Sequence, residues 1–250
     1  MNALVLGGGG SRGAYQVGAI RALKELGYDF QIVTGASVGA LNALFLGHKK
    51  YDLVQNMWTT IDFENVINHK YTSKNKSLET IKAAFKNKGL TLDPLEKLIN
   101  ENVEFDLLKD SPVKIGFVVT GPKGKYLPMK VEDIKTKKEL VDNIIASCSA
   151  YPILKKREIN GELCYDGGFS DKLPVELAKQ MGAKKIIAID IMIGVRKKAK
   201  LDNVEFLYIK PSKKLGFFLN FNRNALDKNI QLGYDDIMRN KDKILDFINK

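Results

Sequence analysis

Gln31-Ile32-Val33-Thr34-Gly35-Ala36-Ser37-Val38-Gly39 is the stretch that decides the fold of this chain of 250 residues. Its first part, Gln31–Thr34, is a short apolar run that is typical of a buried strand. The segment Val38–Leu46 follows and is apolar on nearly all sides, as expected of a buried helix. A strand, a tight turn and a helix in direct succession predict an α/β protein.

The same alternation continues on both sides of this unit. Further strands are expected at Asn2–Leu6, Val113–Thr120, Glu162–Tyr165, Lys185–Ile191 and Val204–Ile209, and further helices at Ala14–Leu26, Leu78–Phe85, Asp93–Ile99, Lys138–Ala146 and Asn224–Ile248. This order predicts a three-layer αβα architecture with a mainly parallel central sheet. Since no repeat, linker or clear boundary interrupts the chain, we predict one domain over residues 1–250.

The amino-acid composition limits the class of protein but does not indicate which kind of molecule it binds. Hydrophobic residues make up 44% of the chain, enough for a sizeable core, and the formal net charge is +11. Such a charge favours contact with lipid head groups or nucleic acid, and it equally fits a general solubilising surface. Because the sequence has no secretory leader and no run of about 18 apolar residues, we expect a cytoplasmic protein.

Ser37 is the first candidate functional residue. The pattern Gly35-Ala36-Ser37-Val38-Gly39 fits G-x-S-x-G between a strand and a helix, the setting of a nucleophile elbow. Small residues at Gly35 and Gly39 allow the backbone to turn sharply and expose the hydroxyl. The alternative is an ordinary serine at the start of a helix, with no chemical role.

A serine nucleophile needs a base, and histidine is the usual one. The chain has two histidines, His48 and His69, and none follows residue 69. His48 would lie about 16 Å along the elbow helix from Ser37, and we expect both to be surface or packing residues. A desolvated carboxylate can serve instead. Asp166-Gly167-Gly168 follows an expected strand, where sites in parallel sheets form, although Asp-Gly is also a common turn.

The glycine-rich loop Gly7-Gly8-Gly9-Gly10-Ser11-Arg12-Gly13 joins the first strand to the first helix. Its N–H groups could bind a phosphate or form an oxyanion hole for an acyl intermediate. Gly8, Gly10 and Gly13 satisfy the G-x-G-x-x-G pattern of dinucleotide-binding folds. Those folds place an acid after the second strand, whereas Asp29 precedes it here. The ending Gly-Lys-Ser/Thr of a Walker loop is absent.

Four segments together resemble the patatin-like phospholipases in their bacterial single-domain form. They are Gly8–Gly13, Gly35–Gly39, Asp166–Gly168, and Ala146–Pro152, which is similar to the family's A-S-x-x-x-P stretch. Their order and rough spacing agree with the family over most of the chain. Lys172 is a departure, since family members often carry asparagine shortly before the proline that follows the acid motif.

The resemblance implies a hydrolase of acyl lipid esters that uses a Ser-Asp dyad. Ser37 would be the nucleophile, Asp166 the base, and the N–H groups of Gly8, Gly9 and Gly10 the oxyanion hole. Supporting residues would be Arg12, which would order the loop or meet a lipid phosphate, and Gly35, Gly39, Gly167 and Gly168. The substrate would be a phospholipid or another acyl lipid, with neither metal nor cofactor and no nucleic acid. A Rossmann-type nucleotide-binding protein and a non-catalytic lipid-binding protein remain as alternatives.

Two segments combine lysines with apolar residues and therefore fit contact with an anionic membrane. They are Lys213–Leu219, which contains Phe217 and Phe218, and the amphipathic Leu78–Phe85. Packing of these aromatic residues beneath the C-terminal helix is the simpler expectation. The second expectation is that the basic surface makes peripheral contact with a membrane.

Overall fold

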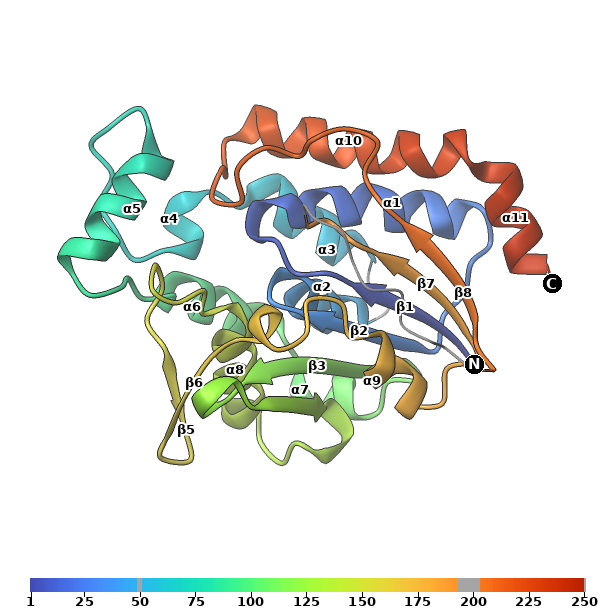
Figure 1. Ribbon diagram of the computed structural model, residues 1–250, viewed down its shortest axis with the longest axis horizontal. Helices are drawn as coiled ribbons and strands as arrows, with labels where there is room; N and C mark the ends of the chain where they lie inside the picture. The colour runs from blue at the N-terminus through green and yellow to red at the C-terminus, as the bar shows by residue number, and fades with distance from the viewer. Residues whose placement is uncertain (49–50, 193–202, 250) are drawn as a thin grey trace.

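The computed structural model describes residues 1–48, 51–192 and 203–249 (Figure 1). Its sheet has the strand order β5-β6-β3-β2-β1-β7-β8, with β4 paired to β3. The strands are β1 Asn2–Leu6, β2 Ile32–Ala36, β3 Lys114–Thr120, β4 Tyr126–Lys130, β5 Arg157–Ile159, β6 Glu162–Asp166, β7 Lys185–Ile189 and β8 Glu205–Ile209. Neighbours among β3, β2, β1, β7 and β8 pair in parallel. The predicted mainly parallel sheet is confirmed.

Helices cover both faces of this sheet, which confirms the three-layer α/β architecture. The helices are α1 Gly13–Glu25, α2 Val38–Leu46, α3 Tyr51–Thr60, α4 Phe63–Val66, α5 Lys76–Lys86, α6 Asp93–Asn102, α7 Phe105–Lys109, α8 Lys137–Cys148, α9 Val175–Gln180, α10 Arg223–Arg239 and α11 Lys241–Asn249. Because side chains alternate along a strand, Leu4 and Leu6 of β1 join the larger core with α1, α2 and α8. Ala3 and Val5 face the smaller core beneath α9.

The first helix and the long C-terminal helix are in backbone contact. In Figure 1, α10 runs alongside α1 over much of its length. A Cβ atom on Gly18 of α1 would lie 1.8 Å from Ile230 O, and one on Gly233 of α10 would lie 2.0 Å from Tyr15 O. Glycine at these two positions therefore lets α10 approach closely enough to anchor the segment that precedes it.

The structure corrects several expected elements. The helix expected over Asn224–Ile248 is two helices, because Asn240 leaves helical geometry and its side-chain amide donates to Asp236 O. Strands β4 and β5 and helix α3 were not expected, and β4, β5 and β6 are antiparallel to their partners. Within the described ranges, no helix has the length and apolar character needed to cross a bilayer.

Candidate active site

Ser37 lies at a strained turn between β2 and α2. Its backbone angles are φ 54° and ψ −127°, a conformation that residues other than glycine rarely adopt. The flanking glycines have no room for a side chain. A Cβ on Gly35 would lie 2.2 Å from Gly39 C, and one on Gly39 would lie 2.1 Å from Leu6 O. This crowding accounts for the G-x-S-x-G pattern, because a larger residue on either side would open the turn.

The Ser37 hydroxyl contacts a carboxylate from a distant part of the chain. Ser37 Oγ donates a hydrogen bond to Asp166 Oδ2 at 2.6 Å, across 129 residues of sequence. Asp166 Oδ1 accepts a second bond from the Gly168 N–H at 2.8 Å. Both side chains are nearly inaccessible to solvent, with residue exposures of 8% for Ser37 and 6% for Asp166. The pair is therefore buried, with both carboxylate oxygens engaged.

Asp166 reaches this position from β6, which runs antiparallel to both of its neighbours in the mainly parallel sheet. It ends β6, which pairs with β3 only at Val119 and Thr120, close to the carboxyl end of β3. Thr120 Oγ1 donates to Asp166 O at 2.8 Å. A Cβ on Gly167 would lie 2.0 Å from Val118 O, so glycine is required where the chain passes β3. This short pairing places Asp166 at the edge where Ser37 also lies.

Burial changes the acidity of the groups beside Ser37. Desolvation raises the pKa of Asp166 to about 6, against the opposing effect of the hydrogen bonds from Ser37 and Gly168. A carboxylate with this pKa is ionised at neutral pH yet can accept a proton. Burial, together with the nearby charge of Asp166, also raises the pKa of the Cys148 thiol. Cys148 is therefore a neutral residue of the cavity wall with low nucleophilicity.

The glycine loop lies directly against the elbow. A Cβ on Gly8 would lie 3.2 Å from Ser37 Cβ. The Gly8 N–H donates to Lys172 O at 3.0 Å, whereas the N–H groups of Gly9 and Gly10 have no partner among the described residues. Gly10 has φ 57°, and a Cβ there would lie 2.3 Å from Phe218 O. Two residues whose backbone N–H groups are unengaged, Gly9 and Gly10, therefore line the same cavity as Ser37.

A segment from the C-terminal part of the chain holds this loop in place. Ser11 N–H donates to Phe218 O at 2.8 Å, and Arg12 Nε donates to Gly216 O at 2.9 Å. Leu215 and Leu219 of the same segment are buried, whereas Phe217 is 40% exposed. The expected packing of the aromatic residues is therefore met only in part, because Phe217 is exposed whereas Phe218 is half-buried against the main core. Phe218 and Leu219 have a further role that the sequence did not indicate, as part of the cavity wall.

Ser147 positions the elbow, a function that the sequence did not assign. Its hydroxyl accepts the Ser37 N–H at 3.0 Å and donates to Val118 O at 2.7 Å. Two residues later, Ser149 O accepts the Asp166 N–H at 3.0 Å. The end of α8 thus contacts the backbone of both Ser37 and Asp166. The A-S-x-x-x-P similarity marked this stretch, but serine patterns alone carry no sign of such long-range contacts.

A cavity of about 440 Å³ opens beside the Ser37–Asp166 pair. It is within the size range of small-molecule sites. Most of its walls are apolar, and they include Leu41, Trp58, Ile61, Ile67, Leu95 and Leu154. Its charged lining residues are Asp166, Arg12 and Lys172. The guanidinium of Arg12 is largely buried, which lowers its pKa.

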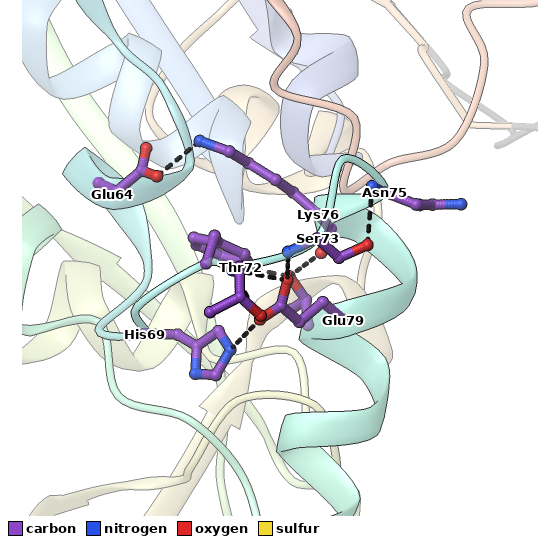
Figure 2. Close-up of polar contacts among 9 residues, drawn as sticks. Glu64, His69, Thr72, Ser73, Asn75, Lys76 and Glu79 are labelled. Atoms are coloured by element: carbon purple, nitrogen blue, oxygen red, sulfur yellow. Dashed lines mark hydrogen bonds and ion pairs between the residues drawn. The ribbon is translucent and has the colours of Figure 1, made fainter.

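Neither histidine is placed to assist Ser37. His69 Nε2 lies 3.3 Å from Glu79 Oε1, in a cluster of polar contacts at the start of α5 (Figure 2). Over the described part of the chain, no histidine lines the cavity. The same residues contain no group of three or more His, Cys, Asp or Glu side chains that could hold a metal ion. The polar chemistry beside Ser37 thus comes from Asp166 and from backbone N–H groups.

Comparison with known proteins is consistent with this geometry. Residues 4–179 match the family model described as patatin-like phospholipase. The chain is 29% identical over 226 residues to patatin-like phospholipase domain-containing protein 7 of Rattus norvegicus, covering 80% of this chain and 14% of that protein. It is 30% identical over 200 residues to lysophospholipase NTE1 of Phaeosphaeria nodorum, covering 75% and 12%. The chain therefore spans about one seventh or less of the length of these relatives.

A solved structure supports the fold independently. The crystal structure of VipD from Legionella pneumophila superposes with a TM-score of 0.51 and covers 97% of this chain and 67% of that one. Sequence identity is 15%, so this likeness concerns the fold alone. The family model covers well over half of the sequence, including Ser37 and Asp166. The chain belongs to the patatin-like phospholipase family.

Proposed function

We propose that this protein is a serine hydrolase of acyl lipid esters in which Ser37 is the nucleophile and Asp166 is the base. One observation carries the proposal: Ser37 Oγ donates to Asp166 Oδ2 at 2.6 Å beside an apolar cavity. A buried carboxylate with a pKa raised to about 6 has the proton affinity that general base catalysis requires near neutral pH.

The reaction proceeds in two steps, the formation of an acyl-serine and its hydrolysis. Ser37 Oγ attacks the ester carbonyl carbon while its proton moves to Asp166 Oδ2, which gives a tetrahedral intermediate. The C–O bond to the alcohol then breaks, and Asp166 returns the proton to the departing alkoxide. Water attacks the resulting acyl-serine with Asp166 again as base. The products are a free fatty acid and the alcohol, and Ser37 is regenerated.

The intermediate requires donors for its negative oxygen. We assign this role to the N–H groups of Gly9 and Gly10, because both lack a partner among the described residues and line the same cavity as Ser37. The Gly8 N–H is engaged with Lys172 O, so Gly8 contributes mainly the space that its missing side chain leaves beside Ser37. Each donor of this kind is worth about 3–4 kcal/mol in the transition state.

The walls indicate the class of substrate. Apolar side chains such as Leu41, Ile67 and Leu95 suit an acyl chain, and a lysophospholipase is among the relatives. Arg12 and Lys172 add positive charge to the same cavity. They would pair with a lipid phosphate. The substrate is therefore a phospholipid or lysophospholipid, reached by peripheral contact with an anionic membrane, which the net charge of +11 favours.

Two other functions are less well supported. A dinucleotide-binding fold would need an acidic residue after the second strand, where this chain has the Ser37 turn. A lipid-binding protein without catalysis would not require Ser37 to be held in a strained turn against a buried carboxylate.

Hydrolysis of a short-chain p-nitrophenyl ester tests the proposal. Ser37→Ala and Asp166→Asn should each lower kcat by at least about a hundredfold, and a fluorophosphonate probe should label Ser37 in the wild type. Full activity of Asp166→Asn would refute the role of the aspartate. Thermal stabilisation by NAD together with the absence of labelling would favour the nucleotide-binding alternative.

A further inference from the structure

Helix α5 lies at the end of the molecule toward which the parallel strands point. In Figure 1 it stands out beyond the sheet on the side of the strands' carboxyl ends, opposite α11. It also adjoins the cavity wall, because Ser77 Oγ donates to Leu219 O at 3.1 Å. Leu219 is a lining residue. Helix α5 is thus in direct contact with a segment that lines the cavity.

One face of α5 exposes large apolar side chains between lysines. Leu78 is 47% exposed and Phe85 is 72% exposed. They are seven residues apart and therefore share a face. Lys82 and Lys86 on the same side are also exposed. The opposite face packs inward through Thr80, Ala83 and Ala84. We call Leu78, Lys82, Phe85 and Lys86 the α5 face.

The single acidic residue of α5 is held away from this face. Glu79 accepts backbone N–H bonds from Thr72 at 3.0 Å and Ser73 at 2.7 Å, and it contacts His69 (Figure 2). These bonds fix the carboxylate against the segment before the helix. Lys76 at the start of the helix pairs with Glu64. Over the part of the chain that the structure describes, Lys82 and Lys86 of the α5 face have no acidic partner.

Further exposed aromatic residues lie at the cavity. Phe169 is a lining residue and is nevertheless 62% exposed. Phe217, next to the lining residue Phe218, is 40% exposed. Exposed large apolar groups beside a cavity usually indicate a surface that binds something apolar. Their position suggests that α5 and the cavity opening contact the same partner.

We propose that the α5 face docks this protein on an anionic lipid bilayer. Leu78 and Phe85 enter the boundary between head groups and acyl chains, and Lys82 and Lys86 contact lipid phosphates. A helix with apolar residues flanked by lysines fits a lipid surface better than a nucleic acid, since Phe85 would gain no burial on a phosphate backbone. The inference deepens the proposed function, because docking brings the cavity to its substrate.

Sedimentation with vesicles of phosphatidylglycerol and phosphatidylcholine tests the docking surface on the full chain. Wild type should bind these vesicles and bind pure phosphatidylcholine weakly. Leu78→Ser with Phe85→Ser should lower the partition coefficient about tenfold or more. Lys82→Glu with Lys86→Glu should lower it by a similar factor on the anionic vesicles only.

Two double substitutions away from α5 control for the loss of exposed apolar side chains and for the change of charge. Leu107→Ser with Phe206→Ser changes two side chains that are 49% and 39% exposed, on α7 and β8. Lys241→Glu with Lys243→Glu makes the same charge change on α11, at the opposite end of the molecule (Figure 1). Both control pairs should bind as wild type does. Equal losses in test and control pairs would overturn the proposal, as would a wild type that does not bind or binds neutral vesicles equally well.

A second readout separates docking from catalysis. Hydrolysis of a soluble short-chain ester should be unchanged in the α5 variants, because none of the four residues lines the cavity. Ser37→Ala should lose that activity and still sediment with anionic vesicles. If wild type proves inactive on every ester, vesicle binding still tests the α5 face. Unchanged vesicle binding by Leu78→Ser with Phe85→Ser would refute docking whatever the activity.

Discussion

The hydroxyl of Ser147 accepts the backbone N–H of Ser37 at 3.0 Å and so fixes the backbone of the Ser37 turn. The same hydroxyl donates to Val118 O at 2.7 Å. One side chain thus joins the end of α8, strand β3 and the Ser37 turn. Because it contacts only the backbone of Ser37, we regard Ser147 as a positioning residue.

Ser147→Ala should lower kcat for a soluble ester with little change in KM. The substitution leaves the Ser37 N–H without its partner, and the free energy of unfolding should fall by about 1–3 kcal/mol. Ser149→Ala is the matched control: it is equally buried, and its hydroxyl bonds only to Ile145 O within the helix. If Ser147→Ala and Ser149→Ala lose stability alike but both retain wild-type kcat, Ser147 has only a structural role.

The rate should increase with pH through the ionisation of Asp166. As the proposed base, Asp166 would act in its charged form, and burial raises its pKa to about 6. kcat/KM for a soluble ester should therefore rise between about pH 5 and 7 and then level off. Adding an organic cosolvent should move the inflection upward, because ionisation of a carboxylic acid creates charge. An inflection that stays in place would indicate a cationic acid such as histidine instead.

Asp166→Asn should stabilise the folded protein at alkaline pH while removing activity. The pKa of Asp166 is higher in the folded state than its ordinary value of 3.8, so the native protein binds more protons between about pH 4 and 6. Its contribution to stability therefore falls as pH rises through that window. Asparagine carries no such charge and can still bond to Ser37 and Gly168.

Urea unfolding of the wild type and Asp166→Asn measures this difference. Near pH 8 the free energy of unfolding of the variant should exceed that of the wild type by about 3 kcal/mol. The difference should shrink below pH 4. A variant that is less stable than wild type at pH 8 would show that the hydrogen bonds to the carboxylate outweigh its desolvation.

Lys172→Asn should weaken the binding of substrates that carry a phosphate. Lys172 is exposed, lines the cavity and has no ion-pair partner among the described residues. The KM for a lysophospholipid should rise about fivefold, the effect of ~1 kcal/mol for an exposed charge pair. Kinetics on a monoacylglycerol should not change. Lys184→Asn, which alters an exposed lysine just before β7, serves as control, and equal effects of the two variants would exclude a phosphate contact.

Local patterns predicted most of the parallel sheet and both residues of the proposed dyad. Consecutive apolar residues identify strands such as β1 and β7, which are buried on both sides. The absence of histidine after residue 69 directed attention to Asp166, which does contact Ser37. These inferences succeed because they depend on residue type and on neighbours along the chain.

The remaining features depend on tertiary contacts. Apolar and polar residues alternate poorly along β4, which has Pro128 at its centre. This segment forms a strand only because β3 lies beside it. Ser147 looks like any helical serine until β3 and the Ser37 turn surround it. The cavity walls come from α2, α3, α6 and the segment before α10, which no local pattern connects. Pocket shape is therefore the part of the site that was least predictable.

The segment that holds the glycine loop lies outside residues 4–179, the range matched by the family model. Phe218 O accepts the Ser11 N–H, and Asn229 of α10 donates to Leu215 O at 3.1 Å. During synthesis, Ser37 and Asp166 are thus both made well before the residues that hold the glycine loop in place. Under the proposed function, a nascent chain would become active only when residues 215–229 had folded back onto its first residues. Proteolysis before residue 215 would silence the protein without touching either proposed catalytic residue.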